Sequence, residues 1–414
     1  MVLKSEIRRS WVVLAAREMG RTVRKVSIEQ RRALLVRRHH LTGDAVGPEQ
    51  ATRAVVALHA TDPASVYLSV LARSRTSTLQ DVAAAMYERR TLVRWMAMRR
   101  TLFLFGRDDI PMVQAAVSTP LAAALRRRLI SRIERNGTEP PVAGPVDTWL
   151  QSLEHAVADA LVGSGSATGA QLAAAVPALG TVIAAPTASE RPQALTSLVL
   201  TLMSAEGGIV RASPTGAWTS RHHRWEPVHS WWPAGIPKSK PAHAESALVR
   251  RWLERFGPAT LEDLQWWTGW TKTTLRRALE AVTINEVDLH GQAGIDLVRP
   301  ELEPGPIAHT RPNVTLLPAL DPTPMGWKHR DWFFGIDRRT VFDRTGNVGP
   351  TIWLNGEVVG SWAATANGVV TALLIDRGHD AAVAVEAAAD QLTRRLDGIA
   401  VTPAARTPLE QSLV

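Results

Sequence analysis

The segment from His59 to Asp62 places three side chains that can handle water and protons within four residues. A neutral imidazole with an ordinary pKa near ~6.5 is a competent general base, so His59 is a candidate for deprotonating a water molecule. The hydroxyl of Thr61 can hold that water, and the carboxylate of Asp62 can orient His59 or stabilise a cationic reactant. We therefore take His59, Thr61 and Asp62 as the candidate catalytic residues.

A structural role for the same segment stays open. His59 stands at the end of an apolar stretch, where a buried or capping histidine is common. Asp62 and Pro63 fit the start of a following helix, with Ser65 in its first turn. The residue types alone do not choose between these roles and catalysis.

Positive charge is concentrated near the start of the chain. Residues 1–40 carry eleven Lys and Arg against three acids, and residues 89–135 carry eleven Arg against three acids, a net charge of +8 in each. The whole chain carries +9, so the remainder carries −7, because 9 − 16 = −7. Such a distribution suits a polyanion, since each neutralised phosphate releases counterions, although arginine also enriches ordinary protein surfaces. The candidate nucleic-acid contacts are Arg94, Arg99, Arg100, Arg126, Arg127 and Arg128.

Composition also excludes several kinds of site. Cysteine is absent, which rules out disulfides, thiolate nucleophiles and Cys-based zinc or iron–sulfur centres. The pairs His39-His40 and His222-His223 lack a third ligand at a suitable spacing, so we expect no metal and no cofactor. No apolar run approaches the ~20 residues that cross a bilayer, and no signal-peptide core is present, so we expect a cytoplasmic protein without a membrane partner.

Three stretches share the order of a winged helix, which is three helices followed by two strands. The last is the clearest. A helix over 244–257 stops at Gly257, Thr260 caps the next with Asp263 in the capping-box position, and a third helix over 271–282 precedes two strands. In the first stretch we expect a helix over 48–60 and strands within 91–105.

The C-terminal part changes character. Short apolar segments, RDWFF at 330–334 among them, are separated by Gly, Asn and Asp and predict strands of a meander, closed by a helix over 380–396. We therefore predict an α+β fold with tandem winged-helix (helix-turn-helix) domains followed by a C-terminal β-rich domain. The expected parts are a basic extension at 1–26, winged helices at 27–135, 148–232 and 243–300, and the β-domain at 305–405.

Several segments, in order, resemble the AlkZ/YcaQ superfamily of winged-helix DNA glycosylases. They span nearly the whole chain, from about residue 27 to 400. The matching segments are VVALHATDP at 55–63, YLSVLARS at 67–74, TLVRWMAMRRTLFLF at 91–105, LLPALDP at 316–322 and GPTIWLNGEVVGSW at 349–362.

The resemblance implies a fold curved around double-stranded DNA by a single chain. It also implies a monofunctional glycosylase that cleaves the N-glycosidic bond of an alkylated purine, including the unhooking of interstrand crosslinks. In that family the catalytic pair is Gln-x-Gln or Gln-x-Asp, and its two positions fall here on His59 and Thr61. Neither residue matches, and Arg100 and Phe103 stand where the family usually has Gly and His.

Two functions remain in view. An N7-alkylated purine already carries positive charge and leaves easily, so a side chain that only positions water suffices, and a His-x-Thr variant can act as a glycosylase. The alternative is a non-catalytic DNA-binding protein, either a regulator or a damage-recognition factor, that keeps the scaffold without the Gln-x-Gln pair.

Overall fold

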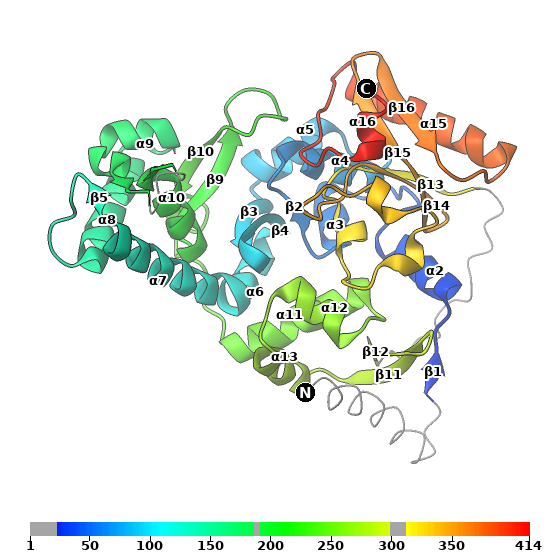
Figure 1. The fold of residues 1–414 in the computed structure, drawn as a ribbon, viewed down its shortest axis with the longest axis horizontal. Helices are drawn as coiled ribbons and strands as arrows, with labels where there is room; N and C mark the ends of the chain where they lie inside the picture. The colour runs from blue at the N-terminus through cyan, green and yellow to red at the C-terminus, as the bar shows by residue number, and fades with distance from the viewer. Residues whose placement is uncertain (1–22, 186–190, 299–311) are drawn as a thin grey trace. The chain divides into compact units, whose positions relative to one another are not determined.

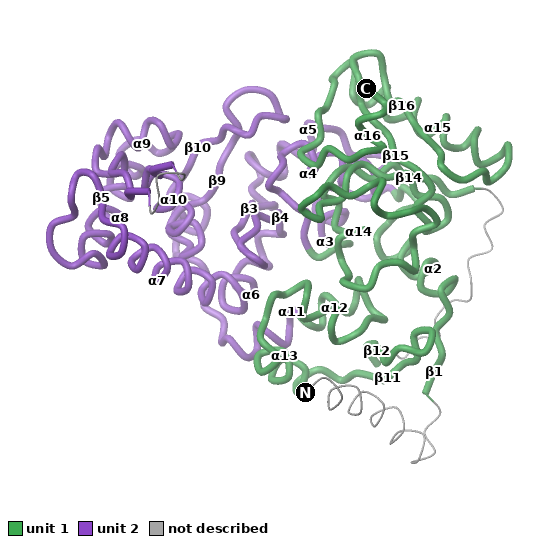
Figure 2. The backbone as a smooth tube through the Cα atoms, viewed as in Figure 1, with its two compact units in different colours: residues 1–44, 54–56, 249–414 green, residues 45–53, 57–248 purple. Residues whose placement is uncertain are grey.

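The computed structural model describes residues 23–185, 191–298 and 312–414. They fold into two compact units of mixed helices and sheets, which confirms the α+β class. The sheet-centred unit comprises residues 45–53 and 57–248, and the β-meander unit comprises the rest of the chain (Figure 2). Most of the expected basic extension, and the segment joining the third winged helix to the β-domain, lie outside the described residues.

A six-stranded sheet organises the sheet-centred unit (Figure 1). Its strand order is β2-β4-β3-β9-β10-β6, and the two expected strands within 91–105 form its central antiparallel hairpin. Residues opposite one another on neighbouring strands point to the same face, which fixes which side chains meet. The strands are β2 (Leu58–His59), β3 (Leu92–Ala97), β4 (Thr101–Gly106), β6 (Ala167–Thr168), β9 (Ile209–Pro214) and β10 (His223–Pro227).

The helix expected over 48–60 is wrong beyond Arg53, where α3 (Pro48–Arg53) ends. Two consecutive valines follow, and β-branched side chains lose rotamer freedom in a helix. Val56 takes a positive φ of 66°, which turns the chain into β2. The candidate residue His59 therefore lies on a strand and not on a helix face.

Helix α3 packs against β4, and helix α4 packs against β2. α5 continues directly into a π-helical turn, Ala84–Glu88, and its start at Thr78 is closed by a capping box with Asp81. The helices are α4 (Pro63–Arg73), α5 (Leu79–Ala83), α6 (Ile110–Val113) and α7 (Thr119–Asn136).

A hydrophobic core of this unit lies among α7, three later helices and the strands β6, β9 and β10 of the sheet. On α8, Leu150, Leu153, Val157 and Leu161 form one buried stripe at helical spacing. A small sheet of order β5-β7-β8 adjoins these helices. The elements are α8 (Val146–Ser164), α9 (Gly169–Ala175), α10 (Leu195–Glu206), β5 (Thr138–Glu139), β7 (Val182–Ile183) and β8 (Gln193–Ala194).

In the β-meander unit, helix α2 starts at a capping box between Ser27 and Gln30. Three helices and the β11–β12 hairpin come later in the order predicted for the third winged helix, and the Thr260–Asp263 capping box forms as expected. Whether this module acts as a winged helix stays a prediction. The elements are β1 (Arg24–Lys25), α2 (Ile28–Arg38), α11 (Pro241–Phe256, of which the part from Val249 belongs to this unit), α12 (Leu261–Thr268), α13 (Lys272–Glu280), β11 (Ile284–Leu289) and β12 (Gln292–Leu297).

The C-terminal strands form a four-stranded antiparallel meander in sequence order, as the turn spacing predicted. Trp353 and Trp362 are buried in it, and each indole N–H donates a hydrogen bond. The expected strand at 330–334 is wrong, because Asp331–Phe333 forms a 3₁₀ turn that packs its aromatic rings together. The elements are β13 (Val314–Leu317), α14 (Pro322–Met325), β14 (Thr351–Leu354), β15 (Glu357–Thr365), β16 (Gly368–Leu373), the predicted closing helix α15 (His379–Leu396) and α16 (Pro408–Gln411).

Candidate functional site

His59 ends strand β2 at the edge of the six-stranded sheet and is half-buried. Its Cα pairs with that of Phe103 on β4, and the two rings meet edge to face with centroids 5.4 Å apart. The ring nitrogen Nδ1 is buried and has no hydrogen-bond partner. The carboxylate of Asp62 therefore does not orient the imidazole through this atom.

Burial, and secondarily the positive charge of Arg99, lowers the pKa of His59 to about 4. The sequence-based expectation of an ordinary pKa near ~6.5 does not hold at this position. At neutral pH the imidazole is uncharged, and it is a weak base because its conjugate acid is strong. In this state His59 resembles an amide side chain, which positions water by hydrogen bonding without taking its proton.

Asp62 is buried directly before helix α4, at the N-cap position that the structural interpretation predicted. Its side chain makes no capping hydrogen bond to the helix backbone. Instead, the hydroxyl of Ser65 donates to Oδ2 at 3.2 Å, and Nε of Arg221 lies 4.0 Å from Oδ1. A carboxylate at a helix N-terminus is favoured as the anion by the helix dipole, so Asp62 presents negative charge beside the loop.

Thr61 lies between these two residues and is exposed. The hydroxyl of Thr61 makes no hydrogen bond to any of the residues that the structure describes, so it is available to a ligand. Thr61 is thus the member of the candidate trio that solvent reaches most readily.

The loop at 215–222, between β9 and β10, covers the start of α4. Trp218 packs against Tyr67 of α4 with ring centroids 5.0 Å apart, and Arg221 approaches Asp62. The contact to Asp62 comes from a segment about 160 residues away in sequence, so the spacing of the residues along the chain did not predict it.

Arg99 and Arg100 occupy the turn between β3 and β4 and are both exposed. Their φ angles are 55° and 61°, a left-handed conformation that is uncommon for residues other than glycine. Strain of this kind concentrates at functional sites. Because the charge of Arg99 acts on His59, this turn belongs to the same site.

Arg94 is the most deeply buried of the candidate DNA-contacting arginines. It is only 3% exposed, and its guanidinium donates to the carbonyl of Ala212. In the sheet, His59, Phe103 and Trp95 form one row, whereas Arg94 belongs to the adjacent row, whose side chains point to the other face. Arg94 is therefore not among the arginines exposed on the surface of this unit.

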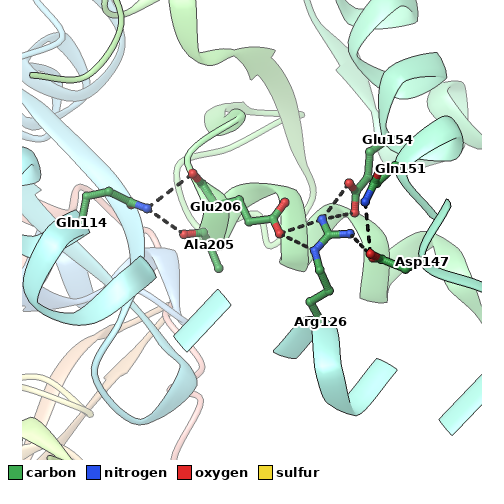
Figure 3. A network of polar contacts seen from close by, with 7 residues as sticks. All are labelled: Gln114, Arg126, Asp147, Gln151, Glu154, Ala205 and Glu206. Carbon is green, nitrogen blue, oxygen red and sulfur yellow. Dashed lines mark hydrogen bonds and ion pairs between the residues drawn. The ribbon is translucent and has the colours of Figure 1, made fainter. Parts of the chain in front are cut away.

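Arg126 is held by three carboxylates (Figure 3). Its guanidinium lies 2.7 Å from both Glu154 and Glu206 and 3.2 Å from Asp147. Burial lowers the pKa of Arg126, but the hydrogen bonds to Glu154 and Glu206 more than offset this and raise it overall. Because these carboxylates neutralise its charge, Arg126 is not one of the arginines that we propose to contact DNA.

Arg127 and Arg128, by contrast, are exposed on α7. Neither has an acidic partner among the described residues. Four of the six candidate arginines are therefore exposed and can contact a phosphate backbone, namely Arg99, Arg100, Arg127 and Arg128.

Neither a metal centre nor a membrane span emerges from the part of the chain that the structure describes. Within it, no group of three or more His, Cys, Asp or Glu side chains could hold a metal ion. Among the same residues, every helix is either too short or too polar to cross a membrane.

Fold and site together define a basic α+β protein whose segment at 59–62 brings together a half-buried neutral imidazole, an exposed hydroxyl and a buried carboxylate. A model of the family described as "DNA glycosylase AlkZ-like" matches residues 52–396, so the chain belongs to the AlkZ-like DNA glycosylase family. Membership makes DNA its partner and a DNA glycosylase role its class of activity.

A solved structure agrees with this fold. Streptomyces sahachiroi DNA glycosylase AlkZ is similar to the chain with a TM-score of 0.67 and 19% sequence identity, over 92% of this chain and 99% of that one. At this identity the likeness concerns the fold. No curated protein matches the chain.

Proposed function

We propose that the chain is a monofunctional glycosylase that hydrolyses the N-glycosidic bond of alkylated or crosslinked purines in double-stranded DNA, acting as a single copy. The observation that supports this most is the state of His59, which is uncharged at neutral pH at the position where the family carries glutamine. A neutral imidazole and the exposed hydroxyl of Thr61 can together hold one water molecule. Asp62 supplies fixed negative charge beside them.

In the proposed step, the water oxygen forms a bond to C1′ as the bond from C1′ to the purine nitrogen breaks. The bonding electrons pass to the purine, whose positive charge they neutralise, and the proton of the attacking water passes to solvent. Positive charge develops on the sugar before the water bond is complete. The anionic carboxylate of Asp62 stabilises that charge electrostatically, which lowers the barrier.

The direct test is incubation of the protein with duplex DNA that carries either 7-methylguanine or a nitrogen-mustard interstrand crosslink. We expect free modified base and an equal number of abasic sites, and separated strands from the crosslinked duplex. Binding that weakens steeply with salt while no base is released would support the non-catalytic alternative instead. That alternative draws on one observation, that Asp62 is already engaged by Ser65 and Arg221.

The pH dependence of base release follows from the lowered pKa of His59. Because the neutral ring is the active form, the rate should stay level from pH 8 down to about pH 5. It should then fall as the pH passes through about 4, where the ring gains a proton. Rates are corrected for depurination of protein-free duplex, and circular dichroism at each pH checks that the fold persists. A falling limb centred near pH ~6.5 would contradict the environment described for His59.

Arg100 offers a test of the strained turn. The variant Arg100→Gly should gain about 1 kcal/mol of unfolding free energy, because glycine adopts a positive φ without steric cost. It should also lose one phosphate contact, which lowers the slope of log affinity against log salt by about 0.9. Denaturant unfolding and salt titration of duplex binding measure the two effects. A stability gain with an unchanged salt slope would remove Arg100 from the DNA contacts.

A further inference from the structure

Two arginines face each other directly inside the six-stranded sheet. Arg94 on β3 pairs with Arg211 on β9, and Arg211 pairs in turn with Trp225 on β10. The three side chains therefore share one face of the sheet, with neighbouring Cβ atoms about 5 Å apart. Like charges at directly opposed positions destabilise a sheet, so this arrangement calls for an explanation.

The two guanidinium groups are poorly compensated. Arg94 is 3% exposed and Arg211 is half-buried, and the Nε atoms of both are buried without a hydrogen-bond partner. The compensation that the structure shows is neutral, since Arg94 donates to the carbonyl of Ala212 and Arg211 lies 5.0 Å from the ring centroid of Trp225. Among the described residues neither has an acidic partner, which is unusual for buried charge.

His223 adds a third nitrogen-bearing side chain to the same place. Its Nδ1 donates to the carbonyl of Arg221 at 3.2 Å, and its ring meets Trp225 with centroids 4.9 Å apart. Nε2 is buried and has no partner, and because Nδ1 carries the proton of the neutral ring, Nε2 is a hydrogen-bond acceptor. Burial, followed by the charges of Arg211 and Arg94, lowers the pKa of His223 to about 4, so no compensating negative charge acts on it.

Aromatic side chains border the pair. The ring centroid of Tyr87 lies 5.9 Å from the guanidinium carbon of Arg94, and Tyr67 is hydrogen-bonded to Tyr87. Trp218 packs on Tyr67, and its indole nitrogen is buried without a hydrogen-bond partner. Tyr87, Trp218, Arg211 and His223 are each half-buried, so the border of the pair lies at the surface of the unit.

We propose that Arg94 and Arg211 form a binding site for a phosphate oxyanion, bordered by His223 and separate from the loop at 59–62. A phosphate has several oxygens that accept hydrogen bonds, and each planar guanidinium can donate two parallel N–H bonds to it. One such ligand would supply both the missing negative charge and the acceptor atoms for the unpartnered Nε–H groups of Arg94 and Arg211. The nearby indole and phenol groups exclude water, which strengthens these interactions.

Two sources carry this chemistry: free inorganic phosphate and a phosphodiester of bound DNA. The 215–222 loop joins the site to the catalytic loop, since Trp218 contacts Tyr67 while Arg221 contacts Asp62. A phosphodiester beside an extruded nucleotide is therefore one source, and this part of the inference rests on the proposed function. Binding of free phosphate does not depend on it.

The first arm measures the melting temperature of the protein in phosphate and in chloride at matched ionic strength. Phosphate should raise the melting temperature by several degrees, because a ligand that binds only the folded state stabilises it. Arg211→Gln should abolish the response while being as stable as the wild type, or more stable, in phosphate-free buffer, because the repulsion from Arg94 is gone. A purely structural Arg211 would give a variant that is less stable in both buffers.

Two further variants sharpen this arm. Arg211→Lys keeps the positive charge but lacks the paired N–H donors of the guanidinium, so it should retain a reduced response. This variant also tests the proposal if the glutamine variant fails to fold. Arg135→Gln removes an exposed arginine of α7 in the same unit and should keep the full response.

The second arm compares duplex binding with and without a neutral methylphosphonate next to the modified nucleotide. If the site takes a DNA phosphate, the substitution should weaken binding to the wild type at least about tenfold and leave binding to Arg211→Gln unchanged. A melting response lost in Arg211→Gln with no such penalty would assign the site to free phosphate. No phosphate response together with equal methylphosphonate penalties in both proteins would overturn the proposal, whether or not base release is observed.

Discussion

Replacing His59 with alanine is expected to slow the release of 7-methylguanine from duplex DNA by about 10²-fold. Positioned groups that assist proton transfer or hold a water contribute about 10²–10⁴-fold, and the low end applies because a cationic purine is a good leaving group and the ring is a weak base. Single-turnover release at pH 7.5 measures the effect. The control is His155→Ala, which removes an exposed histidine on α8, and it should release base at the wild-type rate.

The companion variant His59→Gln separates water positioning from base catalysis. Because the buried imidazole is neutral, an amide at the same place should hold the water equally well and keep the rate within about threefold of the wild type. It should also remove the fall in rate near pH 4, since glutamine does not titrate. Equal losses in the alanine and glutamine variants would show that His59 acts as a base or as a core residue, and unchanged release in both would take it out of the mechanism.

Replacing Arg126 with methionine is expected to lower the free energy of unfolding by about 2–3 kcal/mol. Breaking a buried ion pair costs about 3–5 kcal/mol, because the remaining charges are left uncompensated. The value here is reduced because the Arg126 side chain is 21% exposed and that of Asp147 is 48% exposed. Burial, together with the nearby charges of Glu206 and Asp147, also raises the pKa of Glu154. Without the guanidinium, the repulsion between these carboxylates is no longer offset. Urea unfolding of the two proteins measures the difference.

The same variant checks the division of the arginines into structural and DNA-contacting sets. Arg126→Met should leave the salt dependence of duplex binding unchanged. Binding is measured without urea, at a temperature where the variant is fully folded. Arg127→Gln and Arg128→Gln should each lower that slope by about 0.9 while shifting stability by less than about 0.5 kcal/mol. The opposite pattern, in which Arg126 changes the slope and its neighbours do not, would contradict the assignment.

Local signals in the sequence predicted the local parts of the fold. The capping box at Thr260 forms where its spacing placed it, because Thr260 and Asp263 are three residues apart. The C-terminal meander and its closing helix also follow from short-range alternation and turn residues. The break at Arg53 escaped prediction because an apolar run of this length fits a helix and a buried strand equally well.

The site was predictable only in part, and the reason is sequence distance. The position of His59 and Asp62 in one loop follows from their spacing, but the pKa of His59 depends on burial against Phe103, which lies on a different strand. The partners of Arg126 lie 21 to 80 residues away, and Arg94 and Arg211 are opposed across 117 residues of chain, because 211 − 94 = 117. Only the fold shows which arginines are paired, which are buried and which are exposed.

The most direct test of the central claim is the preference of the protein for a cationic sugar. A duplex that carries a 1-azaribose abasic analogue mimics the charged transition state, and a tetrahydrofuran abasic site is its neutral counterpart. Because an enzyme binds the transition state more tightly than the ground state, the wild type should bind the azaribose duplex at least about 10²-fold more tightly, and Asp62→Asn should lose most of that preference. Equal dissociation constants for the two duplexes in the wild type would contradict the account.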